Sequence, residues 1–92
     1  MLKSEKVWNA LNTSIIEVLP ECASQNIHLE DTLQELGANS IDRVEIITLT
    51  LARLKLKVPL VDFALAKNIS GLIQIFSRTL SHMESSEHVN EL

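Results

Sequence analysis

The chain has 92 residues and a formal net charge of −4, with hydrophobic residues at 46% of positions and charged residues at 22%. This length fits one small domain, and the apolar content is typical of a globular chain. The acidic balance argues against a general nucleic-acid-binding protein, the single cysteine excludes an intramolecular disulfide, and no apolar run is long enough for a membrane span. With few aromatic residues, glycines and prolines, we expect a cytoplasmic, mostly helical domain.

The first periodic segment runs from Ser4 to Leu19. Ser4 is suited to cap this helix, and Pro20 ends it. Its apolar residues recur at helical spacing: Val7, Trp8, Leu11, Ile15, Val18 and Leu19.

Residues 21–39 show no sustained period. Connections of this length without regular structure are uncommon in small domains and tend to be functional. Within it, Asp31 is expected to cap a single helical turn at residues 32–36, and Gly37 is suited to the left-handed conformation that ends such a turn.

A second helix is predicted from Asn39 or Ser40 to about Leu54. Its apolar residues cover two adjoining arcs of the helical wheel, so the helix is either deeply buried or offers a second face to a partner. Because burial on all sides is difficult in so short a chain, we expect the second arc to be exposed. One arc holds Ile46, Ile47, Leu49, Thr50 and Leu54; the second holds Ile41, Val44, Thr48 and Leu51.

Two further helical segments follow a loop at residues 55–59. Residues 61–66 form a short apolar segment that Asp62 is suited to cap, and a last helix is expected to begin at Ser70. Beyond residue 81 the chain is polar, so residues 82–92 are expected to form a disordered tail after a domain at residues 1–81. The predicted fold is an all-α four-helix bundle with three longer helices, a short third helix and a long loop after the first.

Most chemistry-bearing residues show no pattern of an active site. No glycine-rich phosphate loop is present, and the three histidines share no metal-ligand spacing. Cys22 has no neighbouring base or cation in sequence, and Asp42 and Glu45 fit a solvated first helical turn. We therefore expect no catalytic residue and no metal site.

One run combines features that suit a covalent attachment site. Gly37 permits a tight turn, Asn39 can cap the second helix, and Ser40 then lies in the first turn with its hydroxyl outward. A helix N-terminus favours an attached anion, and a surface junction is accessible to a modifying enzyme. On its own, a serine in a first helical turn is commonplace.

The order of these segments resembles the acyl carrier proteins, whose attachment motif reads Leu-Gly-x-Asp-Ser-Leu-Asp/Glu. The resemblance covers residues 4–81, with a long loop ending in Leu-Gly, a serine that opens the second helix, and residues 68–72 where the family opens its last helix. The matching run is Leu36-Gly37-Ala38-Asn39-Ser40-Ile41-Asp42.

The resemblance implies that Ser40 carries a 4'-phosphopantetheine arm, transferred from coenzyme A by a phosphopantetheinyl transferase, whose thiol holds an acyl group as a thioester. The protein would then be a monomer that catalyses no reaction itself. Its expected partners are that transferase, an acyltransferase, and a ketosynthase or hydroxymethylglutaryl-synthase-like enzyme, with no nucleic acid or membrane. The residues expected to contact partners are Asn39, Ile41, Asp42, Arg43, Val44, Glu45, Thr48 and Leu51.

Departures from the family pattern narrow this prediction. Residues 41–57 carry a net charge of +2, from four cations against Asp42 and Glu45, whereas fatty-acid carriers have an acidic second helix. The run Gly-Ala-Asn-Ser-Ile-Asp-Arg resembles freestanding polyketide carriers, some of which donate acetyl units in β-branching. Ile46 stands where carriers that accept the branch often have Trp, which favours the donor role. A fatty-acid-type carrier and an unmodified helical adaptor remain alternatives.

Overall fold

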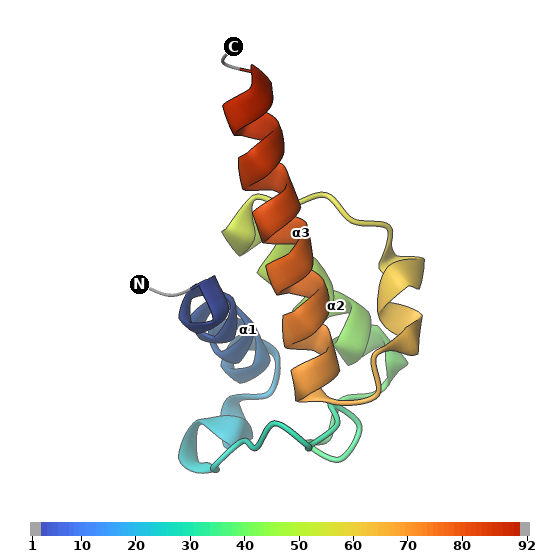
Figure 1. The fold of residues 1–92 in the computed structure, drawn as a ribbon. Coiled ribbons are helices and arrows are strands. Elements are labelled where there is room, and N and C mark those ends of the chain that lie inside the picture. Colours follow the sequence, from blue (N-terminus) through green and yellow to red (C-terminus); the bar gives the residue numbers. More distant parts are fainter. Residues whose placement is uncertain (1–2, 91–92) are drawn as a thin grey trace.

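The computed structural model describes the backbone of residues 3–90 and the side chains of residues 5–82. Over this range the chain is helical and contains no strand (Figure 1). The elements are α1 (Lys3–Val18), η1 (Pro20–Ser24), α2 (Ser40–Leu54), η2 (Leu60–Leu65) and α3 (Ile69–Asn90). The predicted all-α bundle with a long connection between its first two long helices is confirmed. None of the described helices is long and apolar enough to cross a bilayer.

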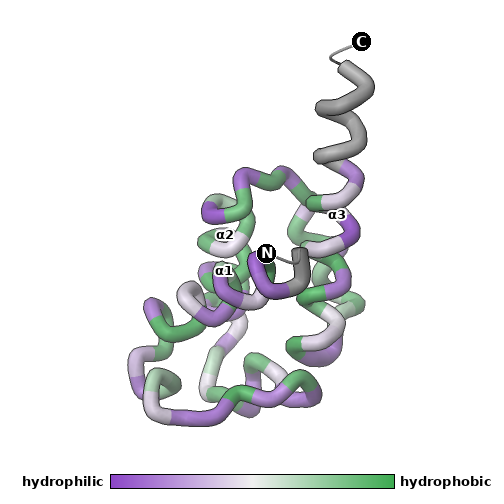
Figure 2. The backbone as a smooth tube through the Cα atoms, turned by 60° about the vertical axis from the view of Figure 1, so that its left-hand side comes forward, coloured by the Kyte–Doolittle hydropathy of each residue, from purple (hydrophilic) through white to green (hydrophobic). Residues whose placement is uncertain are grey.

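The core lies between the three long helices, and the coloured part of each helix contains both hydrophobic and hydrophilic residues (Figure 2). The short η2 is fixed to α3 by the Phe63 and Phe76 rings, whose centroids are 4.8 Å apart. This contact places η2 beside the lower half of α3 (Figure 1). Side chains with no exposed surface include Val7, Leu11, Ile15, Ile46, Ile69 and Phe76.

Leu51 is buried, which corrects its predicted place on the exposed arc of the second helix. The residue that follows the helix, Lys55, is left-handed, with a φ of 56°. The Leu56 N–H donates to the Leu51 carbonyl at 2.9 Å, and the Lys55 N–H donates to the Ala52 carbonyl at 3.2 Å. This is the Schellman arrangement, in which the residue after the left-handed position packs on the helix's last turn. Leu56, itself buried, is therefore brought back over Leu51, which is only 8% exposed.

Three predicted helix starts differ from the structure by one to three residues. Ser4 lies inside α1, which begins at Lys3. Asp62 lies inside η2, whose preceding residue is Pro59, and makes no capping hydrogen bond there. For α3, the Asn68 Oδ1 accepts from the Gly71 N–H at 2.9 Å, so Asn68 replaces Ser70 as the capping residue. At α3 the Asn68 side chain therefore fits the helix start better than that of Ser70, which was chosen from sequence.

The backbone of α3 stays helical to Asn90, beyond the predicted end near residue 81. Its last turns project past the other helices (Figure 1). Leu80 is the last described residue of α3 that is buried in the core. The division into a domain at residues 1–81 and a disordered tail at 82–92 stays a prediction, because the side chains of residues 83–92 lie outside the described part of the chain.

Candidate attachment site at the start of α2

The chain reaches α2 through a single turn that is held by reciprocal hydrogen bonds. The Thr32 Oγ1 accepts from the Glu35 N–H and the Glu35 Oε1 accepts from the Thr32 N–H, both at 3.0 Å. Thr32 therefore caps this turn in place of Asp31, whose Oδ2 instead accepts from the His28 N–H at 2.8 Å. Gly37 ends the turn with a φ of 108°, as its left-handed assignment predicted.

A second pair of reciprocal hydrogen bonds fixes the start of α2. The Asn39 Oδ1 accepts from the Asp42 N–H at 2.8 Å, and the Asp42 Oδ2 accepts from the Asn39 N–H at 3.2 Å. This capping box confirms Asn39 as the N-cap and satisfies backbone donors at the helix start. Ser40 follows as the first residue of the helix, with its side chain exposed.

The long loop is tied to the opposite helix by backbone hydrogen bonds. The Ile69 N–H donates to the Asp31 carbonyl at 2.8 Å, and the Ser70 N–H donates to the Leu29 carbonyl at 2.9 Å. These bonds use N–H groups at the start of α3, which have no partner inside their own helix. These hydrogen bonds therefore hold the loop in place between the starts of α2 and α3.

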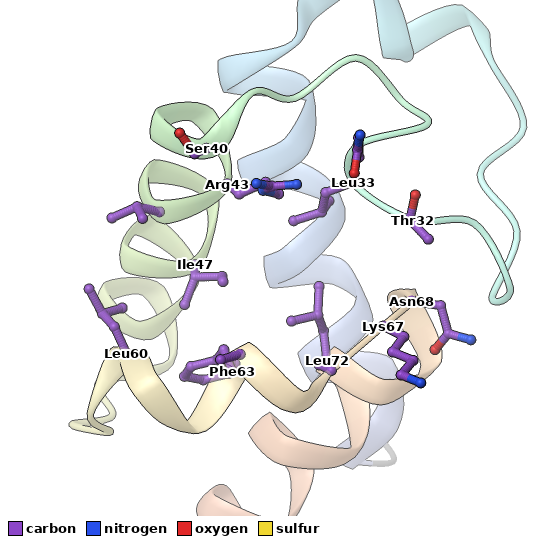
Figure 3. Close-up of a pocket in the computed structure, with 14 residues that line it drawn as sticks. Thr32, Leu33, Ser40, Arg43, Ile47, Leu60, Phe63, Lys67, Asn68 and Leu72 are labelled. Atoms are coloured by element: carbon purple, nitrogen blue, oxygen red, sulfur yellow. The ribbon is translucent and has the colours of Figure 1, made fainter.

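A cavity of about 560 Å³ lies between this loop, α2, η2 and α3. Ser40 lies at its α2 edge, and Arg43 extends from α2 across its mouth toward Leu33 (Figure 3). The apolar part of the lining comes from four elements, and Lys67 and Asn68 line the end away from Ser40 (Figure 3). The apolar side chains include Leu33, Val44, Ile47, Leu60, Phe63 and Leu72.

A shallow hollow lies on the outer side of α2, and Ser40 borders this hollow as well as the cavity. Ile41 is 74% exposed and Val44 is 48% exposed, so the apolar surface predicted for this arc is present at both positions. Glu45 and Thr48 also line the hollow and are exposed. Leu51, which is buried, is not part of this surface.

The two cations of α2, Arg43 and Arg53, have different surroundings. The Arg53 Nη2 lies 2.6 Å from the Glu17 Oε2, and its Nη1 donates to the Ser14 Oγ at 3.1 Å. Arg53, one of the four cations counted in residues 41–57, therefore joins α2 to α1. Arg43 and Lys67 line the cavity and form no ion pair with any described residue.

The other candidates from sequence do not form a reactive site. Cys22 is buried in the core, and its thiol lies 3.7 Å from the Leu36 carbonyl. Burial, with a smaller contribution from the Glu21 carboxylate, raises the pKa of this thiol above its ordinary value of 9.0. Among the described residues no group of three or more His, Cys, Asp and Glu side chains could hold a metal ion.

Sequence reasoning missed the contribution of η2 to this end of the molecule. Leu60, Val61 and Leu65 are large apolar residues with substantial exposure, reaching 87% at Leu65. They lie in a 3-10 helix of six residues, which is too short for a clear periodic pattern. The only signal in the sequence is the density of apolar residues between Pro59 and Ala66.

Fold and site together define a small helical carrier domain: an exposed serine hydroxyl opens a capped helix, beside a cavity that can take a flexible attached group. Residues 9–76 match the family described as "Phosphopantetheine attachment site". The chain therefore belongs to this family, whose cofactor is covalently attached 4'-phosphopantetheine. The exposure of Ser40 and the cationic, acid-free lining next to it fit such a phosphate-linked group.

Two known proteins extend this result. The chain is 42% identical over 74 residues to the polyketide biosynthesis acyl-carrier-protein AcpK of Bacillus subtilis (strain 168), covering 80% of this chain and 90% of that protein. It is also similar to a chain in the crystal structure of the curacin biosynthetic pathway HMG synthase in complex with acetyl donor-ACP. That match has a TM-score of 0.76 and 33% identity, and covers 85% of this chain and 99% of the other.

Proposed function

We propose that Ser40 is the attachment residue for 4'-phosphopantetheine and that the protein is a discrete acyl carrier of polyketide biosynthesis. The observation that carries the proposal is the exposed Ser40 side chain on a helix fixed by the Asn39 cap, within the family match. When bound, the arm supplies a thiol that holds an acyl group as a thioester. The chain's own residues present the hydroxyl on a capped helix start and recognise enzymes, and none acts as an acid or base.

The acyl group is proposed to be acetyl, donated to an HMG-synthase-type enzyme. The similarity to the chain from the complex described as HMG synthase with acetyl donor-ACP supports this role. The proposed docking surface is the exposed part of the second arc with the residues around Ser40: Asn39, Ile41, Asp42, Arg43, Val44, Glu45 and Thr48. Leu51 is omitted because it is buried. The proposed modifying partner is a phosphopantetheinyl transferase, and an acyltransferase or ketosynthase belongs to the proposed loading route.

Attachment is tested by treating the purified protein with coenzyme A and a promiscuous phosphopantetheinyl transferase, followed by intact-mass analysis. The wild type should gain one phosphopantetheine, and Ser40→Ala should gain none. Ser70→Ala is the matched control, because Ser70 also lies in the first turn of a helix and should not affect modification. An arm that persists in Ser40→Ala, or that never attaches to the wild type, would contradict the proposal and favour the unmodified adaptor.

The donor role is tested separately with acetyl-loaded protein and the HMG synthase of the curacin pathway. We expect the acetyl mass to leave the carrier and appear on the synthase, while an acetyl-loaded fatty-acid carrier with an acidic second helix transfers more slowly. The charge difference supports this expectation, because complementary charges steer encounter and exclude wrong partners. Equal transfer from both carriers would leave the attachment result intact but would argue against a specialised donor.

A further inference from the structure

The cavity beside Ser40 is cationic in an acidic protein. Its lining includes Arg43 and Lys67 but no Asp or Glu, although the chain has 12 acidic residues and a net charge of −4. Neither cation forms an ion pair with a described residue. A cation beside apolar surface loses hydration, and an anionic partner compensates for that loss. This lining therefore has the chemistry to receive an anion.

Arg43 is the cation close to the attachment residue. Ser40 and Arg43 are three positions apart on α2, so their side chains are neighbours on the helix surface. Arg43 reaches over the mouth of the cavity, whereas Lys67 lies at the other end, next to Asn68 (Figure 3). An anion linked to the Ser40 hydroxyl would therefore lie closer to Arg43 than to Lys67.

The two sides of Ser40 differ in charge. The outer hollow is lined by the Glu45 carboxylate together with Ile41, Val44, Thr48 and Leu49, and contains no cation. A phosphodiester is repelled by the carboxylate on that side and attracted by the guanidinium on the cavity side. The charge pattern thus gives an arm on Ser40 a preferred direction.

We propose that Arg43 binds the phosphodiester of the arm on Ser40 and directs the arm into the cavity between α2, η2 and α3. This inference rests on the proposed attachment at Ser40. A guanidinium can donate two parallel hydrogen bonds to phosphate oxygens, a geometry that the Lys ammonium cannot reproduce. Arg43 is a positioning residue for the cofactor, and Lys67 adds to the positive potential without contacting the phosphodiester.

The test compares isotope-labelled apo and holo protein by proton–nitrogen correlation spectra, after intact mass has shown complete attachment. In the wild type, attachment should shift the Arg43 Nε–H signal and the amides of Leu33, Phe63 and Leu72, which line the cavity. In Arg43→Gln the shifts at the three cavity amides should fall about two- to five-fold, which corresponds to about 0.4–1 kcal/mol for a partly exposed charge pair.

Arg78→Gln on α3 is the matched control, because it removes the same charge from an exposed residue outside the cavity lining. Arg78→Gln should reproduce the wild-type shifts. Arg43→Lys should give intermediate shifts, and it replaces Arg43→Gln if the transferase does not modify Arg43→Gln. Wild-type shifts in Arg43→Gln, or their loss in Lys67→Gln alone, would overturn the assignment. A wild type that gains no arm would instead refute the proposed function, which the mass measurement reveals before any spectrum is compared.

Discussion

Leu51 and Ile41 provide a direct test of how α2 divides between core and surface. Both were predicted on one exposed arc, yet Leu51 is 8% exposed and Ile41 is 74% exposed. Replacing Leu51 by Ala removes about three methylene equivalents from the interior, worth about 2–2.5 kcal/mol at roughly 0.8 kcal/mol each. Because Leu51 borders a shallow hollow with Thr48 and Val58, the neighbours can partly close the space, so the cost should lie at the lower end of the range of about 2–5 kcal/mol for such changes.

The assay is urea denaturation of the apo protein followed by circular dichroism. We expect Leu51→Ala to lower the free energy of unfolding by about 2–3 kcal/mol, with an unchanged denaturant slope. Since about 4–8 °C in Tm accompanies each kcal/mol in a domain of this size, thermal melting should report the same loss. Ile41→Ala is the matched control and should stay within about 0.5 kcal/mol of the wild type. A loss below about 0.5 kcal/mol for Leu51→Ala would refute the packing of Leu56 over this side chain.

Three further predictions concern the cap of α2, the ion pair between α2 and α1, and the buried thiol. Asn39→Ala should lower the free energy of unfolding by about 0.5–2 kcal/mol in urea denaturation, whereas Asn39→Asp, which keeps the capping oxygen, should cost little. A double-mutant cycle with Arg53→Gln and Glu17→Gln should give a coupling of about 0.2–1 kcal/mol that weakens with added salt; a salt-independent value would argue against an ion pair. Burial raises the pKa of the Cys22 thiol above 9.0 in the folded protein. The stability that comes from keeping this thiol neutral is therefore present below pH 9.0 and is lost as the pH rises toward the folded-state pKa. Folded apo protein should therefore react slowly with thiol reagents, and urea denaturation should show a larger loss of stability above pH 9.0 for the wild type than for Cys22→Ala.

The parts of the site that sequence could predict are those set by local hydrogen bonding. Gly37, Asn39 and Ser40 were placed correctly because turn formation and helix capping depend on residues three or four positions apart. The same locality explains the small errors at Asp31 and Ser70, where Thr32 and Asn68, also good capping residues, stand one or two positions earlier or later. Capping patterns thus locate a helix start but do not choose between adjacent candidates.

The parts that sequence could not predict depend on contacts between distant segments. The burial of Leu51 follows from Lys55, which adopts a left-handed conformation that Gly usually provides, so the sequence carries no sign of the reversal. Likewise, Arg53 reads as a free surface cation until the fold brings Glu17, 36 positions away, within 2.6 Å. The cavity also depends on contacts between distant segments, because its walls come from the loop, α2, η2 and the start of α3.

Three sets of contacts hold the segments around Ser40 in place. The capping box holds the start of α2, the loop is hydrogen-bonded to the start of α3, and Arg53 joins α2 to α1, so the backbone that carries Ser40 is held in place. An arm attached at Ser40, as proposed, would then supply the motion that is needed to reach successive enzymes. Val44 lines both the outer hollow and the cavity. An enzyme that docks on Ile41 and Val44, as proposed, would therefore contact a wall of the space that the arm is proposed to occupy.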